Sequence, residues 1–326
     1  MKAVSNLLAI LLVIFVAFIS CKKESKPVTS PVVITYAPEF VSSTVITVGF
    51  RVESDGGSRI TDCGLYIGNA PSPETLGNKI QVASDTGSFY LYLSGLNAST
   101  QYYLKAYAIN AKGTSLGEQV IFTTPAKITD YENNFYETVT IGTQSWMTSN
   151  LKAVHYMNGD PIISTVPVSF DISGESTPKY QWSYNGDDLT NYTIYGKLYT
   201  YYTVTDSRKI CPVGWHVPTD NDWITLENYL GGANYAGSYL KESGNNHWIA
   251  PYNTDAYNIT LFTALPGGTR SSAGTFSLLG NYGYFWSTTE ADASTSWARS
   301  MFVQSSQVKR ENISKKNAAS VRCIKD

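Results

Sequence analysis

Residues 210–232 read ICPVGWHVPTDNDWITLENYLGG, and this stretch decides how the second half of the chain folds. Thr219 is placed to cap a helix, and Asp222, three residues later, completes a capping box. Trp223 and the leucines after it recur at helical spacing, which predicts one apolar face packed on a core. The two glycines that close the stretch predict the end of the helix. The acidic residues at its start therefore have a structural role without any catalysis, because the helix dipole favours negative charge there.

The same stretch also has to be considered as an active site or a metal site. Cys211, His216 and Asp220 stand too close together in sequence for a known nucleophile, base and acid arrangement. The three histidines of the chain are far apart and lack zinc-binding spacing. The acidic loops lack the ligand spacing of an EF-hand. We therefore expect no catalytic residue, no metal and no cofactor, and we expect that the chain is not an enzyme.

The N-terminus has the layout of an exported protein. Residues 1–20 join a short positive start to an apolar run that ends at a small residue, as in a secretory signal peptide. The run FISC at 18–21 resembles the lipobox of bacterial lipoproteins. That resemblance implies an acylated Cys21 as the first mature residue and residues 21–30 as a polar tether; a plain signal peptide is the alternative. We expect a lipid-anchored protein of the outer membrane on the cell surface, with the periplasmic face as the alternative.

Length and composition bound the remaining possibilities. A mature chain of about 300 residues predicts two domains more readily than one. The formal net charge is −2, and no basic block or stripe occurs, so nucleic acid is excluded as an expected partner. The many Tyr and Gly residues and the few charged ones are typical of extracytoplasmic β-rich proteins.

Residues 31–124 predict an all-β, immunoglobulin-like sandwich. Short alternating runs, among them STVITVGFRV and SFYLYLSGL, are separated by turn signals. The run at 94–124 resembles the last three strands of a fibronectin type III domain. The resemblance implies that Tyr102 is the corner tyrosine, its hydroxyl bonded to nearby backbone. Cys63 is expected to be a buried, unreactive thiol. We interpret this domain as a spacer, with an adhesive module as the alternative.

Residues 128–326 have a different composition, and all seven tryptophans of the chain lie there. The ordered motifs YGKLYTYYTV, WHVPTDNDW, ALPGGTR, FWSTTEADASTSWARS and VRC strongly resemble the Fibrobacter succinogenes major paralogous domain, often called FISUMP. A more distant resemblance is to the sulfatase-modifying factor fold, which is related to C-type lectins. The two resemblances imply an α+β, C-type-lectin-like domain.

The cysteines predict one disulfide. Cys21 is assigned to the lipid and Cys63 lies in the other domain, so Cys211 and Cys323 remain as a pair in an oxidising compartment. An oxidised cysteine is no nucleophile. The sulfatase-modifying enzymes depend on a late cysteine, and the matching stretch at 285–303 has none. This makes such an enzyme the least favoured function.

The long loops between the predicted helix and the last strands are rich in Gly, Asn, Tyr and Trp, a composition suited to stacking on sugar rings and bonding their hydroxyls. The leading hypothesis is a non-catalytic binding or adhesion module for a glycan or another surface polymer, with a surface protein as a further expected partner. The alternative is a structural or assembly component of the envelope without a soluble ligand. The candidate ligand-binding residues are His247, Trp248, Tyr252, Asp255, Arg270, Tyr282, Tyr284 and Glu290.

Overall fold

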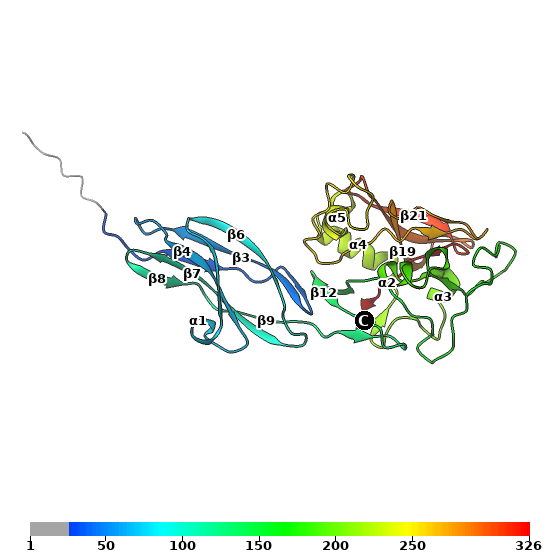
Figure 1. Ribbon diagram of the computed structural model, residues 1–326, viewed down its shortest axis with the longest axis horizontal. Coiled ribbons are helices and arrows are strands. Elements are labelled where there is room, and N and C mark those ends of the chain that lie inside the picture. Colours follow the sequence, from blue (N-terminus) through cyan, green and yellow to red (C-terminus); the bar gives the residue numbers. More distant parts are fainter. Residues whose placement is uncertain (1–25) are drawn as a thin grey trace, which may run out of the picture.

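The computed structural model describes residues 26–326, which form two lobes lying end to end (Figure 1). The predicted signal peptide at 1–20 and the predicted lipidation site Cys21 lie outside the described residues. Among residues 26–326, no helix combines the length and the apolar character needed to cross a bilayer. Strands outweigh helices in the described chain, as the predicted fold class requires.

The N-terminal lobe is an antiparallel β-sandwich, which confirms that part of the prediction. In one layer β3 pairs with β1, β2 and β6, and the other layer has the order β5-β4-β7-β8, with β9 also paired to β7. Its elements are β1 (Val32–Thr35), β2 (Phe40–Ser42), β3 (Val45–Ser54), β4 (Asp62–Gly68), α1 (Pro73–Leu76), β5 (Asn78–Ala83), β6 (Gly87–Ser94), β7 (Gln101–Asn110), β8 (Gly113–Leu116) and β9 (Val120–Thr123).

The sandwich forms because alternate residues of its strands are apolar. In β3, Ile46, Val48 and Phe50 point into the core between the layers and are fully buried. The hydroxyl of Tyr102 accepts a hydrogen bond from the Asn97 backbone N–H at 2.9 Å, as expected of a corner tyrosine. Cys63 is a free, buried thiol, and burial raises its pKa, which keeps it protonated and inert.

The C-terminal lobe mixes short sheets with helices. Its separate sheets have the orders β14-β15-β22-β17-β18, β19-β20-β21 and β10-β11. Its elements are β10 (Ile128–Thr129), β11 (Phe135–Tyr136), β12 (Thr138–Ile141), β13 (Gln144–Met147), β14 (Gln181–Trp182), the 3₁₀ helix η1 (Tyr184–Gly186), α2 (Asn191–Tyr195), β15 (Leu198–Thr200), α3 (Tyr201–Val204), β16 (Trp215–His216), α4 (Asp220–Tyr229), α5 (Ala233–Leu240), β17 (Thr269–Arg270), β18 (Phe276–Ser277), β19 (Tyr282–Glu290), β20 (Thr295–Phe302), β21 (Val308–Ser314), β22 (Ala318–Ala319) and β23 (Ile324–Lys325).

Helix α4 has the predicted start, face and end. Thr219 accepts from the Asp222 backbone N–H, and the Asp222 carboxylate accepts from the Thr219 backbone N–H, so the capping box is complete. Trp223 is fully buried and donates its indole N–H to the Trp286 carbonyl at 3.2 Å. The chain leaves the helix through Gly231 at a positive φ of 86°, a conformation that glycine adopts without strain.

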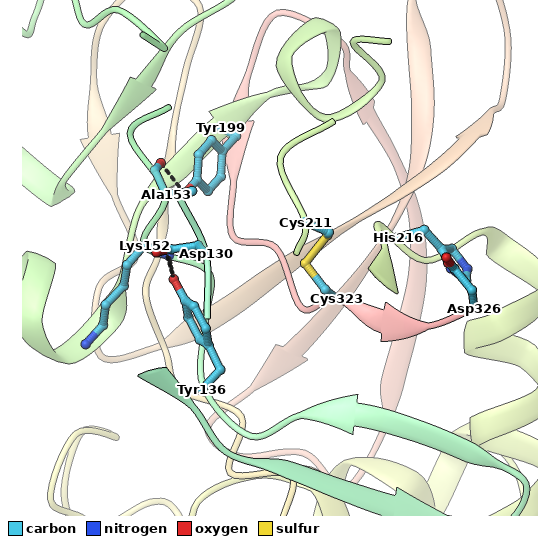
Figure 2. Close-up of a disulfide and its surroundings, with 9 residues drawn as sticks. All are labelled: Asp130, Tyr136, Lys152, Ala153, Tyr199, Cys211, His216, Cys323 and Asp326. Atoms are coloured by element: carbon cyan, nitrogen blue, oxygen red, sulfur yellow. Dashed lines mark hydrogen bonds and ion pairs between the residues drawn. A yellow bond between two sulfur atoms is a disulfide. The ribbon is translucent and has the colours of Figure 1, made fainter. Parts of the chain in front are cut away.

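The predicted disulfide between Cys211 and Cys323 is present (Figure 2). The residues that follow the two cysteines pair as strands, because β16 lies antiparallel to β23. The bond therefore fastens the last strand to the segment that leads into α4. It closes a span of 112 residues, which contains most of the lobe.

Two buried tyrosines fix the chain beside this region (Figure 2). The hydroxyl of Tyr136 donates to the Asp130 carboxylate and accepts from the Lys152 backbone N–H. The hydroxyl of Tyr199 donates to the Ala153 carbonyl at 2.8 Å. These side-chain bonds add to the backbone bonds of the loop after β13, such as the one from the Leu151 N–H to the Val321 carbonyl.

A single buried guanidinium joins distant parts of the lobe. Arg322, one residue before the disulfide, is fully buried. It donates to the Asn150 side-chain oxygen at 2.7 Å and to the backbone carbonyls of Met147, Phe262 and Thr263. Burial lowers the pKa of Arg322 to about 9, so the group stays charged at neutral pH.

One sheet crosses from the first lobe into the second. β2 pairs with β12, and the path continues through β13 and β23 to β16. Phe40 of β2 lies in the same apolar cluster as Trp146 and Trp223 of the second lobe. Thr44 donates to the Glu137 carboxylate at 2.8 Å across the same junction. The first domain therefore also contributes Phe40 to the core of the second, a contact that the spacer interpretation did not include.

We predict that Phe40→Ala lowers the free energy of unfolding of the second lobe by about 3–5 kcal/mol, the usual cost of emptying a buried phenylalanine site. All seven tryptophans lie at position 146 or later, so tryptophan fluorescence during urea unfolding reports on that lobe alone. Leu65→Ala, in the core of the sandwich, is the control and should shift this transition less. An unchanged transition in Phe40→Ala would show that the two cores are independent.

We also predict that Cys211→Ser with Cys323→Ser lowers the free energy of unfolding by about 4–5 kcal/mol, from the loop-closure entropy of the released chain. Calorimetry of the double variant and of Cys63→Ser separates this loss from a general effect of removing thiols. Equal melting temperatures for the double variant and the unmodified protein would refute the prediction.

Candidate functional site

The acidic residues at the start of α4 serve a buried ion network. Arg299 on β20 is fully buried and binds two carboxylates of α4. One is Asp220, at 2.7 Å, and the other is Glu227, about two turns later on the same face of the helix. Arg310 on β21 binds the other oxygen of Asp220 at 2.9 Å and lies over the Trp297 ring. These contacts fix α4 to the sheet formed by β19, β20 and β21, so Asp220 has a structural role.

The pKa values of the two carboxyl groups in this network shift in opposite directions. Burial opposes ionisation of Asp220, but the hydrogen bonds from Arg310 and Arg299 outweigh it and lower its pKa. The stability from this group is therefore present above the ordinary carboxyl pKa and is lost as the pH falls through the lowered value. Burial raises the pKa of Glu227 despite its contact with Arg299.

The histidine of residues 210–223 also has carboxylate partners. His216 contacts Asp326 through Nδ1 at 2.7 Å (Figure 2). Its Nε2 lies 3.4 Å from the Asp222 carboxylate. An apolar hollow of about 370 Å³ lies beside the disulfide, lined by Trp215 and Val217 among others. Cys211 lines this hollow, but it is bonded to Cys323 and presents no thiol. In residues 26–326 no three His, Cys, Asp or Glu side chains are grouped to hold a metal ion.

Two of the predicted ligand-binding residues are corrected by their burial. Trp248 is 1% exposed and donates its indole N–H to the Ala264 carbonyl. Arg270 is 0% exposed, stacks on Trp182, and donates to the carbonyls of Val168 and Phe170. Neither side chain can reach a ligand at the surface, since one fills a core and the other ties a loop to β17.

The other six predicted residues are accessible but are not gathered in one hollow. His247 contacts Glu242 at 2.8 Å, and Glu290 accepts from Lys315 at 2.7 Å. Tyr282 and Tyr284 stack on each other along β19, and burial raises the pKa of Tyr284 to about 12. Tyr252 and Asp255 are exposed in the loop after α5. As ligand contacts, these six remain predictions.

A different site lies where the two lobes meet. A cleft of about 610 Å³ has one wall from the sandwich and one wall from the loop after α5. We call it the interdomain cleft. Its lining residues are Glu39, Phe40, Thr47, Tyr90, Leu91, Tyr92, Ser243, Tyr257, Asn258 and Ile259.

Three tyrosines of the interdomain cleft are unusually exposed. Tyr90 and Tyr92 on β6 have 73% and 63% of their surface accessible, and Tyr257 has 59%. Successive side chains of a strand point to opposite faces, so Tyr90 and Tyr92 share the outer face while Phe89 and Leu91 pack inward. Large aromatic rings that stay accessible on two adjoining elements form a surface on which a ligand can stack.

The local structure fixes the position of Tyr90. Gly49 of β3 lies directly opposite it, and an added Cβ there would come within 2.9 Å of the tyrosine ring. The ring therefore lies over the bare backbone of the neighbouring strand. Sequence reasoning missed these tyrosines because it treated the first domain as a spacer. The available signal was SFYLYLSGL at 88–96, where tyrosines occupy the solvent-facing positions of an alternating strand.

The fold and the site define a two-domain protein in which a β-sandwich is fused through one sheet to a disulfide-closed domain of strands and helices. The chain belongs to the Fibrobacter succinogenes major domain family, whose model matches residues 139–325. The match confirms the family predicted from the motifs of the second half. It begins inside β12, the strand that the sandwich covers.

Three solved structures show only distant likenesses to the chain. No curated protein matches the chain. The sensor domain of the anti-sigma factor RsgI4 of Pseudobacteroides cellulosolvens is 14% identical, with 31% of this chain and 99% of that chain covered and a TM-score of 0.25. The fourth FNIII domain of a human protein is 20% identical, with 31% and 87% covered and a TM-score of 0.23. Titin domains A168–A170 are 21% identical, with 29% and 31% covered and a TM-score of 0.21. Likenesses this low carry no argument about function.

We predict that Arg299→Met lowers the free energy of unfolding by about 3–5 kcal/mol, because it leaves Asp220 and Glu227 buried with less compensation. Arg310→Met is the matched control and should cost less, since that side chain is partly exposed. Urea unfolding at pH 7 measures both. Equal losses in the two variants would refute the central role given to Arg299.

Proposed function

We propose that this chain is a non-catalytic binding protein of the cell surface that is anchored by a lipid on Cys21. Its ligand is a glycan or another surface polymer. The observation that carries the proposal is the interdomain cleft, where three accessible tyrosines from two lobes surround one hollow. Aromatic faces stack on the C–H faces of sugar rings, and neighbouring hydroxyl and amide groups bond the sugar hydroxyls.

The contacts at the junction of the lobes support this assignment. Tyr90 and Tyr92 come from the sandwich and Tyr257 comes from the second lobe, so the site exists only while the lobes hold their relative position. The β2–β12 pairing and the burial of Phe40 hold that position without a ligand. A site that is already formed loses little conformational entropy when it binds.

The alternative functions have less support. A purely structural envelope component has no need for three exposed aromatic rings in one cleft. A sulfatase-modifying type of enzyme would need a free cysteine in the second lobe, and the bond between Cys211 and Cys323 argues against it. The likeness of that lobe to C-type lectins stays a prediction, and binding in the cleft does not depend on it.

The test is a binding screen of residues 22–326 against polysaccharides and host glycans, with and without a calcium chelator. We expect binding that is lost in Tyr90→Ala with Tyr92→Ala. Tyr235→Ala is the matched control, because Tyr235 is 62% exposed and lies outside the cleft. Thermal melts establish that each variant is folded.

The outcomes separate the hypotheses. Binding that is insensitive to the cleft tyrosines would place the site elsewhere, with Tyr252 and Asp255 as the next residues to replace. Binding abolished by chelation would require a calcium ion, which the sequence does not predict. Failure to bind any polymer would favour the structural function.

A further inference from the structure

The interdomain cleft is one of three hollows that follow β6. A second hollow, of about 300 Å³, lies on the sandwich side, and Tyr90 lines both it and the cleft. A third, of about 590 Å³, extends toward α1, and Tyr92 lines both it and the cleft. Each of the two tyrosines of β6 therefore lines the cleft and one of the two adjoining hollows. This arrangement suits a ligand longer than a single small molecule.

The chemistry of the three hollows is almost free of charge. Among residues 26–326, Glu39 is the only charged side chain that lines them. The other polar groups are hydroxyls and amides, such as those of Ser94, Asn69 and Asn258. The rest are aromatic or aliphatic side chains and glycine backbone, including Leu76, which is 85% exposed at the far end.

The scarcity of charged side chains in the lining favours uncharged polymers over charged ones. A single-stranded nucleic acid also stacks on aromatic rings, but its site needs a positively charged groove along the backbone. Sulfated or carboxylated polysaccharides need cations for the same reason. In the part of the chain that the structure describes, no Lys, Arg or His lines these hollows, and Glu39 would repel an anionic chain. An uncharged chain with apolar faces and hydroxyl edges matches the lining.

We propose that the ligand is a neutral polysaccharide that lies across β6 and occupies the interdomain cleft together with at least one adjoining hollow. This inference rests on the proposed function and narrows its ligand class. Its binding is insensitive to salt, because no ion pair forms. Its affinity rises with chain length until the hollows are filled, and each stacked tyrosine contributes on its own.

The experiment uses residues 22–326 and pairs of polymers that share a backbone. Hydroxyethyl cellulose is compared with carboxymethyl cellulose, and dextran with dextran sulfate, at low and high salt. We expect binding to a neutral member only, with less than about a twofold change in affinity between the two salt conditions. We expect Tyr90→Ala, Tyr92→Ala and Tyr257→Ala each to weaken binding by about tenfold, the scale of one stacking contact. Tyr235→Ala should bind as the unmodified protein does.

Glu39→Gln supplies a further measurement. It should leave the affinity for a neutral chain within about twofold and should weaken the exclusion of the carboxylated chain. Preferential binding of an anionic polymer that still needs the cleft tyrosines would overturn this inference and leave the proposed function intact. Neutral-polymer binding that survives all three tyrosine substitutions would also overturn it. Failure of all four polymers to bind would overturn this inference, and failure throughout the broader glycan screen would remove the proposed function as well.

Discussion

The fold of the second lobe depends on the buried charge of Arg322, which has no carboxylate partner among residues 26–326. Its guanidinium gathers backbone carbonyls from β13 and from the loop before β17, in addition to the Asn150 side chain. Phe262 and Phe285 lie close to the guanidinium, so water does not replace these bonds. Because a buried cation must find several acceptors at once, one arrangement of these loops is strongly favoured over others. The disulfide at the next residue then fixes the same point covalently.

Local patterns predicted the parts of the structure that depend on neighbouring residues. The capping box at Thr219, the apolar face of α4 and the corner hydrogen bond of Tyr102 each need only a few residues in sequence. The pairing of Cys211 with Cys323 followed from counting cysteines per domain. The sandwich was predicted from apolar and polar residues that alternate along each strand. This pattern can be read strand by strand, because one face of each strand is buried and the other is exposed.

The parts that sequence reasoning missed all depend on long-range packing. Trp248 and Arg270 have side chains that suit a ligand, but burial is decided by segments far away in the sequence. Phe40 reads as an ordinary strand residue of the sandwich, although its ring lies in the neighbouring core. The interdomain cleft could not be inferred from the sequence, because Tyr90 and Tyr257 line the same cleft only after both lobes have folded. Tyrosines on the polar side of β6 were the one local sign of it.

The pairing of β2 with β12 protects a sheet edge of the second lobe. The family match begins at Val139, in the middle of the strand that β2 covers. A copy of this domain cut free at that point would present an open sheet edge beside an unfilled apolar site. Such an edge is a template for strand addition between molecules and leads to self-association. In this chain the sandwich closes that edge through β2 and fills the apolar site with Phe40.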